Sequence, residues 1–438
     1  MRKFGRCGVA ATLVAVLLTM AAAPAHAAAG FTSSPSSGPA GTTITVTSTT
    51  ACPAPPAGTT FGGVEIDLLN GPATETEAFS DATTDASRTW HGTLVVPAGL
   101  RNGEYHVGAA CLLDDDSVYF GYFPDEFIVT SPAGQTDPAV RLAGTDRIET
   151  AIATSNDIYP APDGLADAVV LARADSFADA LAGTPLARDM GAPLLLTGRD
   201  SLDARTAAEI DRVLDPGLPV FVLGGTAAIS DAVTASLVNG GHSVTRLAGV
   251  NRYDTAVKVA GAMDTQSTLL LATGTDFHDG LVAGAAAFSA SADPVAPVAA
   301  VLLTNGGTMP PETKAYIDAH ASLPRFAIGA PAAAADSGAT PIVGSSDADT
   351  SRKVAERFFA GRGSVAIASA ANFPDALSGG NHAAAFGAPL LFSDPEALPA
   401  TVHDYLVSVK GVVSIAFVYG GTAAVFDRTR TAIAQAIT

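Results

Sequence analysis

Basic residues and long apolar runs are both scarce in this 438-residue chain. It carries 24 Lys and Arg against 43 Asp and Glu, which gives a formal net charge of −19 at pH 7. Because a phosphate backbone attracts a basic stripe, this acidity argues against a nucleic-acid ligand. The uncharged run at residues 8–20 is too short to cross a bilayer comfortably, and no longer run follows it. The sequence therefore predicts no membrane span.

The sequence motifs that mark common catalytic sites are missing as well. We find no G-x-S-x-G elbow, no H-E-x-x-H, no Walker loop and no G-x-G-x-x-G. Hydrolysis needs a nucleophile or a metal together with a poised base, and the sequence offers no such set. We therefore expect a protein that is not an enzyme and that holds no cofactor and no metal.

The first residues predict export. A basic start (Arg2, Lys3 and Arg6) precedes the short apolar run, and Ala25-His26-Ala27 supplies a small-x-small cleavage pattern. We expect a signal peptide over residues 1–27. Cys7 lies before the apolar run, whereas a lipoprotein cysteine would follow it, so we expect a released protein that remains at the cell wall or cell surface without a covalent anchor.

Cysteine is nearly absent from the rest of the chain. Only Cys52 and Cys111 lie beyond the expected cleavage point. In an exported domain the simplest expectation is that they form a disulfide; two unpaired buried thiols are the alternative. Two cysteines alone provide too few ligands for a metal site.

Residues 28–130 alternate short β-rich segments with Pro- and Gly-rich turns. About seven such segments in about 100 residues are typical of an antiparallel sandwich. The Gly38–Thr42 run, Trp90 and the Gly103–Cys111 segment resemble a bacterial immunoglobulin-like domain. The resemblance implies an all-β immunoglobulin-like sandwich that is open to a protein partner. The Pro- and Gly-containing stretch at 131–139 is typical of a linker.

Beyond the linker, four short segments recur three times in the same order. They are Arg141–Arg147, Asp175–Leu181, Pro193–Thr197 and Val222–Thr226 in the first copy, Arg246–Arg252, Thr275–Leu281, Ala300–Thr304 and Ala327–Ala330 in the second, and Pro341–Asp347, Asn372–Leu377, Pro389–Ser393 and Val418–Thr422 in the third. We therefore divide this region into repeat 1 (140–241), repeat 2 (242–336) and repeat 3 (337–438).

Each repeat alternates apolar strand-like runs with Ala-rich helical segments. In repeat 1 the strands are expected near 140–143, 168–172, 193–197 and 220–223. Strands that are apolar throughout are buried on both faces, so we expect three Rossmann-like α/β modules with mainly parallel sheets. No flexible linker separates the copies, and we therefore expect the three modules to pack into one body.

Taken together, the R-L-x-G-x-x-R opening, the F-x-D-A-L segment, the P-L-L-L-T strand and the G-G-T-A turn resemble the cell wall binding repeat 2 family. The resemblance covers residue 140 to the C-terminus. It implies a three-lobed anchor that holds a surface protein to anionic polymers of the Gram-positive cell wall. Ala330 replaces the second Gly of the turn in repeat 2, and Pro341 and Asp347 replace both Arg of the opening in repeat 3.

The repeated polar residues are candidates for ligand contact. Asp179, Asp279 and Asp375 each follow a buried strand near a helix start, where a carboxylate relieves the helix dipole; we favour this structural role over ligand contact. The neighbouring phenylalanines are expected in the core or between modules. The histidines occupy non-equivalent places in the repeats, so a shared catalytic histidine is not expected.

Two kinds of glycine turn could cradle an anion with backbone amides. The first contains Gly144 with Arg147, and Gly249 with Arg252. The second is the Gly-Gly-Thr turn, present as Gly224, Gly225 and Thr226, and again as Gly420, Gly421 and Thr422. The alternative is that glycine merely permits a tight turn and that the arginines pair with acids of the protein.

The sequence thus predicts a secreted, non-catalytic surface protein. Three tandem repeats would hold an anionic wall polysaccharide or teichoic-type polymer and display the β-sandwich. The alternatives are a secreted adhesin or assembly factor whose repeats bind protein, and a wall hydrolase of unrecognised class. Since the chain is itself acidic, metal-bridged binding of an anionic polymer also stays open.

Overall fold

A computed structural model of the chain forms two compact units, one up to Thr136 and one from Asp137. We call them the β unit and the repeat unit. The expected signal peptide (1–27) and most of the expected linker lie outside the described residues. The structure describes residues 30–39, 41–70, 75–97, 103–115, 117–129, 138–160, 165–263, 266–290 and 299–438.

Two sheets build the β unit, one with the strand order β1-β3-β7-β6 and one with the order β2-β9-β8-β4-β5. Neighbouring strands are antiparallel except β2 and β9, which are parallel. The strands are β1 (Phe31–Ser34), β2 (Ser37–Gly38), β3 (Thr43–Ser48), β4 (Phe61–Asn70), β5 (Glu75–Asp81), β6 (Thr83–Thr84), β7 (Trp90–Val95), β8 (Gly103–Leu113) and β9 (Val118–Val129).

Alternation along the strands creates the core of the β unit. In β3, Ile44 and Val46 are buried while the threonines between them are exposed, as a period of two requires. The indole N–H of Trp90 donates to the Tyr122 hydroxyl at 3.1 Å. Cys52 and Cys111 are joined by a disulfide in this core.

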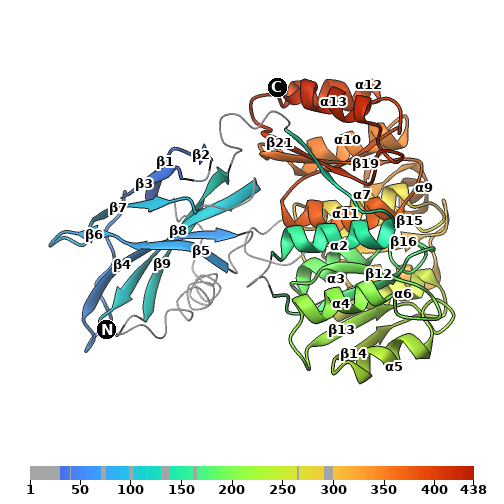
Figure 1. Ribbon diagram of the computed structural model, residues 1–438, viewed down its shortest axis with the longest axis horizontal. Coiled ribbons are helices and arrows are strands. Elements are labelled where there is room, and N and C mark those ends of the chain that lie inside the picture. Colours follow the sequence, from blue (N-terminus) through green and yellow to red (C-terminus); the bar gives the residue numbers. More distant parts are fainter. Residues whose placement is uncertain are drawn as a thin grey trace. The chain divides into compact units, whose positions relative to one another are not determined.

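The repeat unit contains three parallel four-stranded sheets, which we number by chain order (Figure 1). Sheet 1 has the order β12 (Leu194–Thr197), β11 (Val169–Arg173), β13 (Pro219–Leu223), β14 (Ser243–Leu247). Sheet 2 has the order β16 (Ala300–Thr304), β15 (Leu269–Thr273), β17 (Arg325–Ile328), β18 (Thr340–Ile342). Sheet 3 has the order β10 (Ala139–Leu142), β21 (Ile415–Tyr419), β19 (Ser364–Ser369), β20 (Leu390–Ser393).

Helices cover the sheets because their central strands are apolar on both sides. Strands β11, β15 and β19 are buried almost throughout, which only helices on both faces can achieve. The helices are α2 (Arg147–Ile158), α3 (Gly183–Asp189), α4 (Ala204–Val213), α5 (Asp231–Asn239), α6 (Arg252–Ala262), α7 (His278–Ala286), α8 (Pro311–Ala319), α9 (Ala330–Ala335), α10 (Asp347–Phe358), α11 (Pro374–Ala385), α12 (Ala400–Ser408) and α13 (Asp427–Ile437). None of the described helices is long and apolar enough to cross a membrane.

The sheets do not coincide with the sequence repeats. The opening strand of repeat 2, β14, pairs with β13 of repeat 1, and the opening strand of repeat 3, β18, pairs with β17 of repeat 2. A strand that follows a short crossover helix packs beside the strand it has just left. In sheet 3 the corresponding place beside β21 is taken by β10 from repeat 1. The first strand of repeat 1 therefore lies in sheet 3, whereas the other three lie in sheet 1.

One apolar cluster runs through all three sheets, so the three modules pack as one body, as expected. Packed against this cluster, the partly buried rings of Phe177, Phe277 and Phe373 form a triangle, with ring centroids 5.6–6.1 Å apart. The expectation that these rings pack between modules is confirmed. Small residues let the surrounding helices approach closely: a Cβ on Gly284 of α7 would lie 3.1 Å from Thr184 of α3.

Candidate functional site

Equivalent glycines follow the fourth and last strand of each sequence repeat. Gly224, Gly329 and Gly420 follow β13, β17 and β21, and all have φ between 83° and 92°. A side chain would be strained there, because L residues rarely adopt positive φ. In an open parallel sheet the carboxyl ends of the strands form the edge where ligands bind. These turns are therefore the natural place for a site.

The three repeated aspartates lie against these glycines. A Cβ on Gly224 would lie 2.6 Å from a carboxylate oxygen of Asp179. The corresponding separations are 1.9 Å for Gly329 with Asp279 and 2.5 Å for Gly420 with Asp375. The positions thus need glycine for a second reason, since a side chain would displace the carboxylate.

Asp279 and Asp375 lie in the first turns of α7 and α11, as expected, and the N-cap residues Phe277 and Phe373 make no side-chain capping hydrogen bond. Burial, with the nearby Asp347 and Asp276 adding to it, raises the pKa of Asp279 to about 7. Burial also raises the pKa of Asp375, against the opposing effects of the Thr150 hydroxyl and of Arg147. These carboxyls are therefore buried groups in contact with the turns.

The amides of the Gly-Arg turns are used inside the protein. Gly144 N–H donates to the Thr150 hydroxyl at 3.2 Å, and Gly249 N–H donates to the Thr255 hydroxyl at 3.0 Å. Caps of the following helices complete the arrangement, since Asp146 and Asn251 each accept two backbone N–H groups. These contacts favour the alternative in which glycine permits a turn.

The two arginines of these turns also have internal partners. Arg147 Nη1 donates to the Ala174 carbonyl at 2.7 Å, and Arg252 Nη1 donates to the Gly274 carbonyl. The Arg252 guanidinium lies 5.6 Å from the centre of the Phe177 ring. Both cations thus hold the loops that follow the central strands.

The Gly-Gly-Thr turns differ from the Gly-Arg turns, because arginines bind their carbonyls. Arg246 donates to the carbonyls of Gly224 and Ile229, at 2.9 and 2.8 Å, and so fixes the outline of the first turn. Among the described residues, no acceptor contacts the amides of Gly225 and Thr226. Arg141 fixes the turn at Gly420 in the same way, through hydrogen bonds to carbonyls at both of its ends. The turn amides are therefore held rigid and left available.

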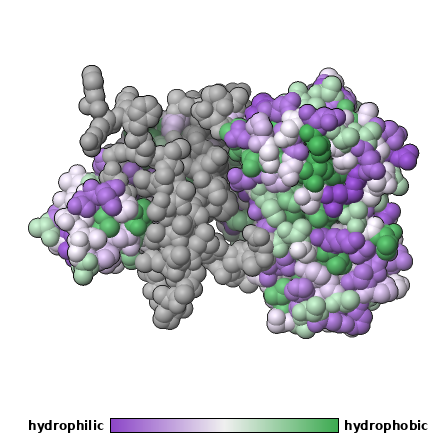
Figure 2. Space-filling view, turned by 90° about the horizontal axis from the view of Figure 1, so that it is seen from below, coloured by the Kyte–Doolittle hydropathy of each residue, from purple (hydrophilic) through white to green (hydrophobic). Residues whose placement is uncertain are grey.

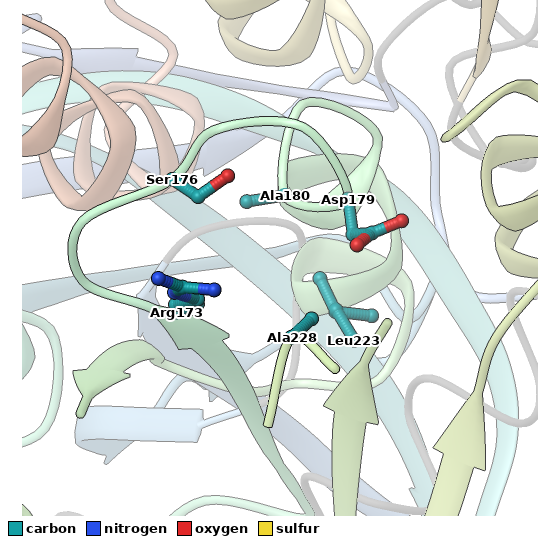
Figure 3. Close-up of a pocket in the computed structure, with 6 residues that line it drawn as sticks. All are labelled: Arg173, Ser176, Asp179, Ala180, Leu223 and Ala228. Carbon is teal, nitrogen blue, oxygen red and sulfur yellow. The ribbon is translucent and has the colours of Figure 1, made fainter. Parts of the chain in front are cut away.

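A pocket opens beside the first of these turns, between the ends of β11 and β13. Arg173 and Asp179 lie on opposite sides of it, with Leu223 and Ala228 between them (Figure 3). Arg173 forms a two-point ion pair with Asp175. The ends of these two strands lie where the chain reverses direction across the sheet, the switch point at which open α/β sheets take ligands.

A second arginine borders the same turn. Arg199 Nε donates to the Ala227 carbonyl at 3.0 Å, and half of its side chain is exposed. Arg173 contacts the same carbonyl at 3.4 Å. The first switch point thus brings together free turn amides and two arginines, with the carboxylates of Asp175, Asp179 and Asp200 beside them. The amides and the arginines suit a phosphate or carboxylate.

The family model for cell wall binding domain 2 (CWB2) matches this chain three times, at residues 141–234, 246–337 and 342–430. Together these matches cover more than half of the chain. The chain belongs to the CWB2 family. The matched residues all lie in the repeat unit, and the domain they define is a binding module.

Among curated proteins, the N-acetylmuramoyl-L-alanine amidase LytC of Bacillus subtilis is 27% identical over 283 residues. This match covers 62% of the present chain and 53% of the amidase. The amidase enhancer of the same organism is 34% identical over 141 residues, which cover 32% of this chain and 19% of the relative. The chain thus spans about half or less of these relatives, and no catalytic domain is shown by the matches.

Two solved structures share the fold. Cwp6 from Clostridium difficile aligns with a TM-score of 0.62 at 17% identity, covering 93% of this chain and 68% of its own. Cwp8 from the same organism aligns with a TM-score of 0.61 at 16% identity, covering 91% and 89%. These structures show the fold, and the three matched segments of the chain are cell wall binding domains.

Sequence reasoning missed the two arginines of the first switch point. Arg173 follows a buried strand at the place that Thr273 and Ser369 occupy in the other CWB2 repeats. A cation that appears once at a repeated strand end was the available signal. Arg199 carried no such signal, because only the fold brings its loop beside the Gly-Gly-Thr turn.

Proposed function

We propose that this protein is an exported, non-catalytic surface protein. Its CWB2 repeats attach it non-covalently to an anionic cell-wall polysaccharide or teichoic-type polymer, and the β unit is displayed. The observation that carries the proposal is the first switch point, where Arg173 and Arg199 border the unused amides of Gly225 and Thr226. The family match supplies the class of target.

An acidic protein can bind an anion through a local cluster of cations. Beyond a screening length of about 8 Å at physiological salt, the remaining charge of the chain is largely screened. On the side drawn in Figure 2, hydrophilic residues cover most of the repeat unit, with only scattered apolar ones. Such a face suits a charged, hydrated polymer better than an apolar partner.

We further propose that residues 28–130 form an immunoglobulin-like domain after a signal peptide at 1–27 and before a linker at 131–139. The order β1-β3-β7-β6 against β2-β9-β8-β4-β5 supports it, because two antiparallel sheets of that layout are typical of such sandwiches. A displayed sandwich is suited to a protein partner. We also propose residues 140–241, 242–336 and 337–438 as the bounds of the three sequence repeats.

The test is retention on purified cell walls, measured by co-sedimentation. We expect the double variant Arg173→Ala, Arg199→Ala to be retained about 10-fold or more weakly, because a charge-assisted hydrogen bond is worth roughly 1.5–3 kcal/mol where water is excluded. Lys314→Ala, which removes an exposed cation on α8 that pairs with Asp318, is the control. Retention should also fall with rising salt.

Three outcomes decide between the readings. Loss of retention after the anionic polymers are stripped from the walls supports the proposal. Unchanged retention on stripped walls would point to the adhesin or assembly reading, in which the repeats bind protein. Turnover of wall polymer that is abolished by a single polar substitution would establish the hydrolase reading and end the proposal of a non-catalytic anchor.

A further inference from the structure

Three backbone carbonyls occupy equivalent places after the central strands β11, β15 and β19. Each accepts a hydrogen bond from a side-chain nitrogen. Arg147 donates to Ala174 and Arg252 donates to Gly274. At the third place, Ala370 accepts instead from Nε2 of His278, at 2.8 Å.

The third arginine is missing because Asp347 stands at its position, the first residue of α10. His278 takes over the contact from the other side of the boundary, since it belongs to repeat 2 whereas Ala370 belongs to repeat 3. In the other two repeats, Ala178 and Pro374 match His278. At the boundary between repeats 2 and 3, therefore, the arginine is absent and a histidine makes its contact.

Both ring nitrogens of His278 face acceptors. Nδ1 lies 2.5 Å from Oδ1 of Asp276 and 3.7 Å from Oδ2 of Asp347, and Nε2 faces the carbonyl of Ala370. Burial alone would raise the pKa of Asp276, but hydrogen bonds from the amide and ring of His278 lower it, so this carboxylate accepts. A neutral imidazole has a single N–H and can satisfy only one side.

We propose that His278 is a proton-dependent clasp between repeats 2 and 3, closing the boundary as an imidazolium where the other repeats use an arginine. The side chain is 14% exposed. It is also packed between the rings of Phe277, with centroids 3.9 Å apart, and Phe392, at 5.1 Å. The ring therefore has little freedom to turn when it loses a proton.

The charged groups that face His278 are all carboxyls. Among the described residues they are Asp276 and Asp279 from the repeat 2 side and Asp347 from α10; the β19–α11 loop contributes a carbonyl and β20 a phenyl ring. Without the imidazolium these carboxyls repel one another. The boundary should therefore weaken as the pH rises and tighten as it falls.

His382 provides a matched comparison within the same unit. Its Nε2 lies 3.0 Å from Oδ2 of Asp157, which can accept, and its Nδ1 lies 2.9 Å from the Tyr419 hydroxyl, which can donate. One donor and one acceptor satisfy a neutral ring. His382 thus links α11 to α2 without needing a second ring proton.

The first experiment reads the ring protons directly in the full chain labelled with ¹⁵N-histidine. At about pH 6, long-range ¹H–¹⁵N correlations should show both nitrogens of His278 protonated, while His382 shows a single tautomer. The signals that disappear in the His278→Ala variant are those of His278. A neutral His278 at this pH would overturn the proposal.

The second experiment rebuilds the arrangement of the other repeats with the double variant His278→Ala, Asp347→Arg. Thermal midpoints are followed by circular dichroism at the helix band, because the described helices all lie in the repeat unit. Between about pH 5 and pH 8, the midpoint of the unchanged chain should fall by about 2–4 °C more than that of the double variant. His403→Ala, an exposed histidine on α12, is the control. Equal pH dependence in all three proteins would refute the clasp.

Discussion

Arg141→Ala tests how the repeat unit is closed. Arg141 lies in β10, the strand that completes sheet 3 from the far end of the chain. Its Nη1 donates to the Gly420 carbonyl and its Nη2 to the Val425 carbonyl, both at 2.7 Å, with Asp427 at 3.1 Å. The substitution removes these contacts and leaves two carbonyls without their donor.

The expected loss follows from the burial of this side chain, which is 18% exposed. Hydrogen bonds from a charged donor contribute roughly 1.5–3 kcal/mol each, and two bonds from one group are not additive, so we expect about 2–4 kcal/mol. The exposed Asp427 adds little. With an unfolding entropy of roughly 2 cal/mol/K per residue, the midpoint of the repeat unit should fall by about 3–6 °C.

Arg246→Ala is the matched variant, because Arg246 makes the same contacts to the turn at Gly224. The partners of Arg246 lie 22 residues away or closer, whereas Gly420 lies 279 residues from Arg141. Local hydrogen exchange distinguishes the two. Arg141→Ala should speed exchange along β21 and α13, and Arg246→Ala should affect only sheet 1.

Lys314→Ala supplies the baseline for a solvated cation. The contrary result is that Arg141→Ala lowers the thermal midpoint no more than Lys314→Ala does and leaves exchange in β21 unchanged. In that case β10 is held in sheet 3 by its backbone hydrogen bonds alone. The reasoning from the two carbonyl contacts would then be refuted.

Three further outcomes are expected. Arg147→Ala and Arg252→Ala should each destabilise the repeat unit by about 1–3 kcal/mol in thermal melts while folded protein still sediments with walls, because their partners are internal carbonyls; a selective loss of retention would restore them as anion ligands. The pKa of Asp279 is raised from 3.8 to about 7, so its proton stabilises the fold fully below about pH 4, and this stability is lost as the pH rises through 7. Asp279→Asn should remove up to roughly 4 kcal/mol of that pH dependence in urea titrations. An unchanged pH dependence would show that the carboxyl ionises near its ordinary value. Cys111→Ser, which opens a disulfide spanning 59 residues, should destabilise the β unit by about 4 kcal/mol, seen as an earlier urea transition of Trp90 fluorescence; an unchanged midpoint would show that the bond adds nothing.

The sequence alone determined the elements and their repetition. Apolar runs such as Val169–Arg173 are buried when the chain folds, so they predicted parallel strands between helices. The repeated segments predicted three modules. The phenylalanines Phe177, Phe277 and Phe373 were recognisable as packing residues because the same ring recurs at one place in an apolar setting. Such local patterns depend only on hydrophobic period and turn chemistry.

Tertiary structure decided which strand pairs with which and what each charge contacts. Pairing β10 with β21 brings residues nearly 300 positions apart together, and no local pattern encodes that choice. The sequence left Arg147 and Arg252 open as anion ligands or as partners of groups within the protein, and packing gives them internal carbonyls. In the sequence His278 is a histidine without an equivalent in the other repeats, and only the fold places it beside Asp347 and Ala370. A side chain's partners are set by the fold, because hydrogen bonds act over about 3 Å and the chain can bring any two residues that close.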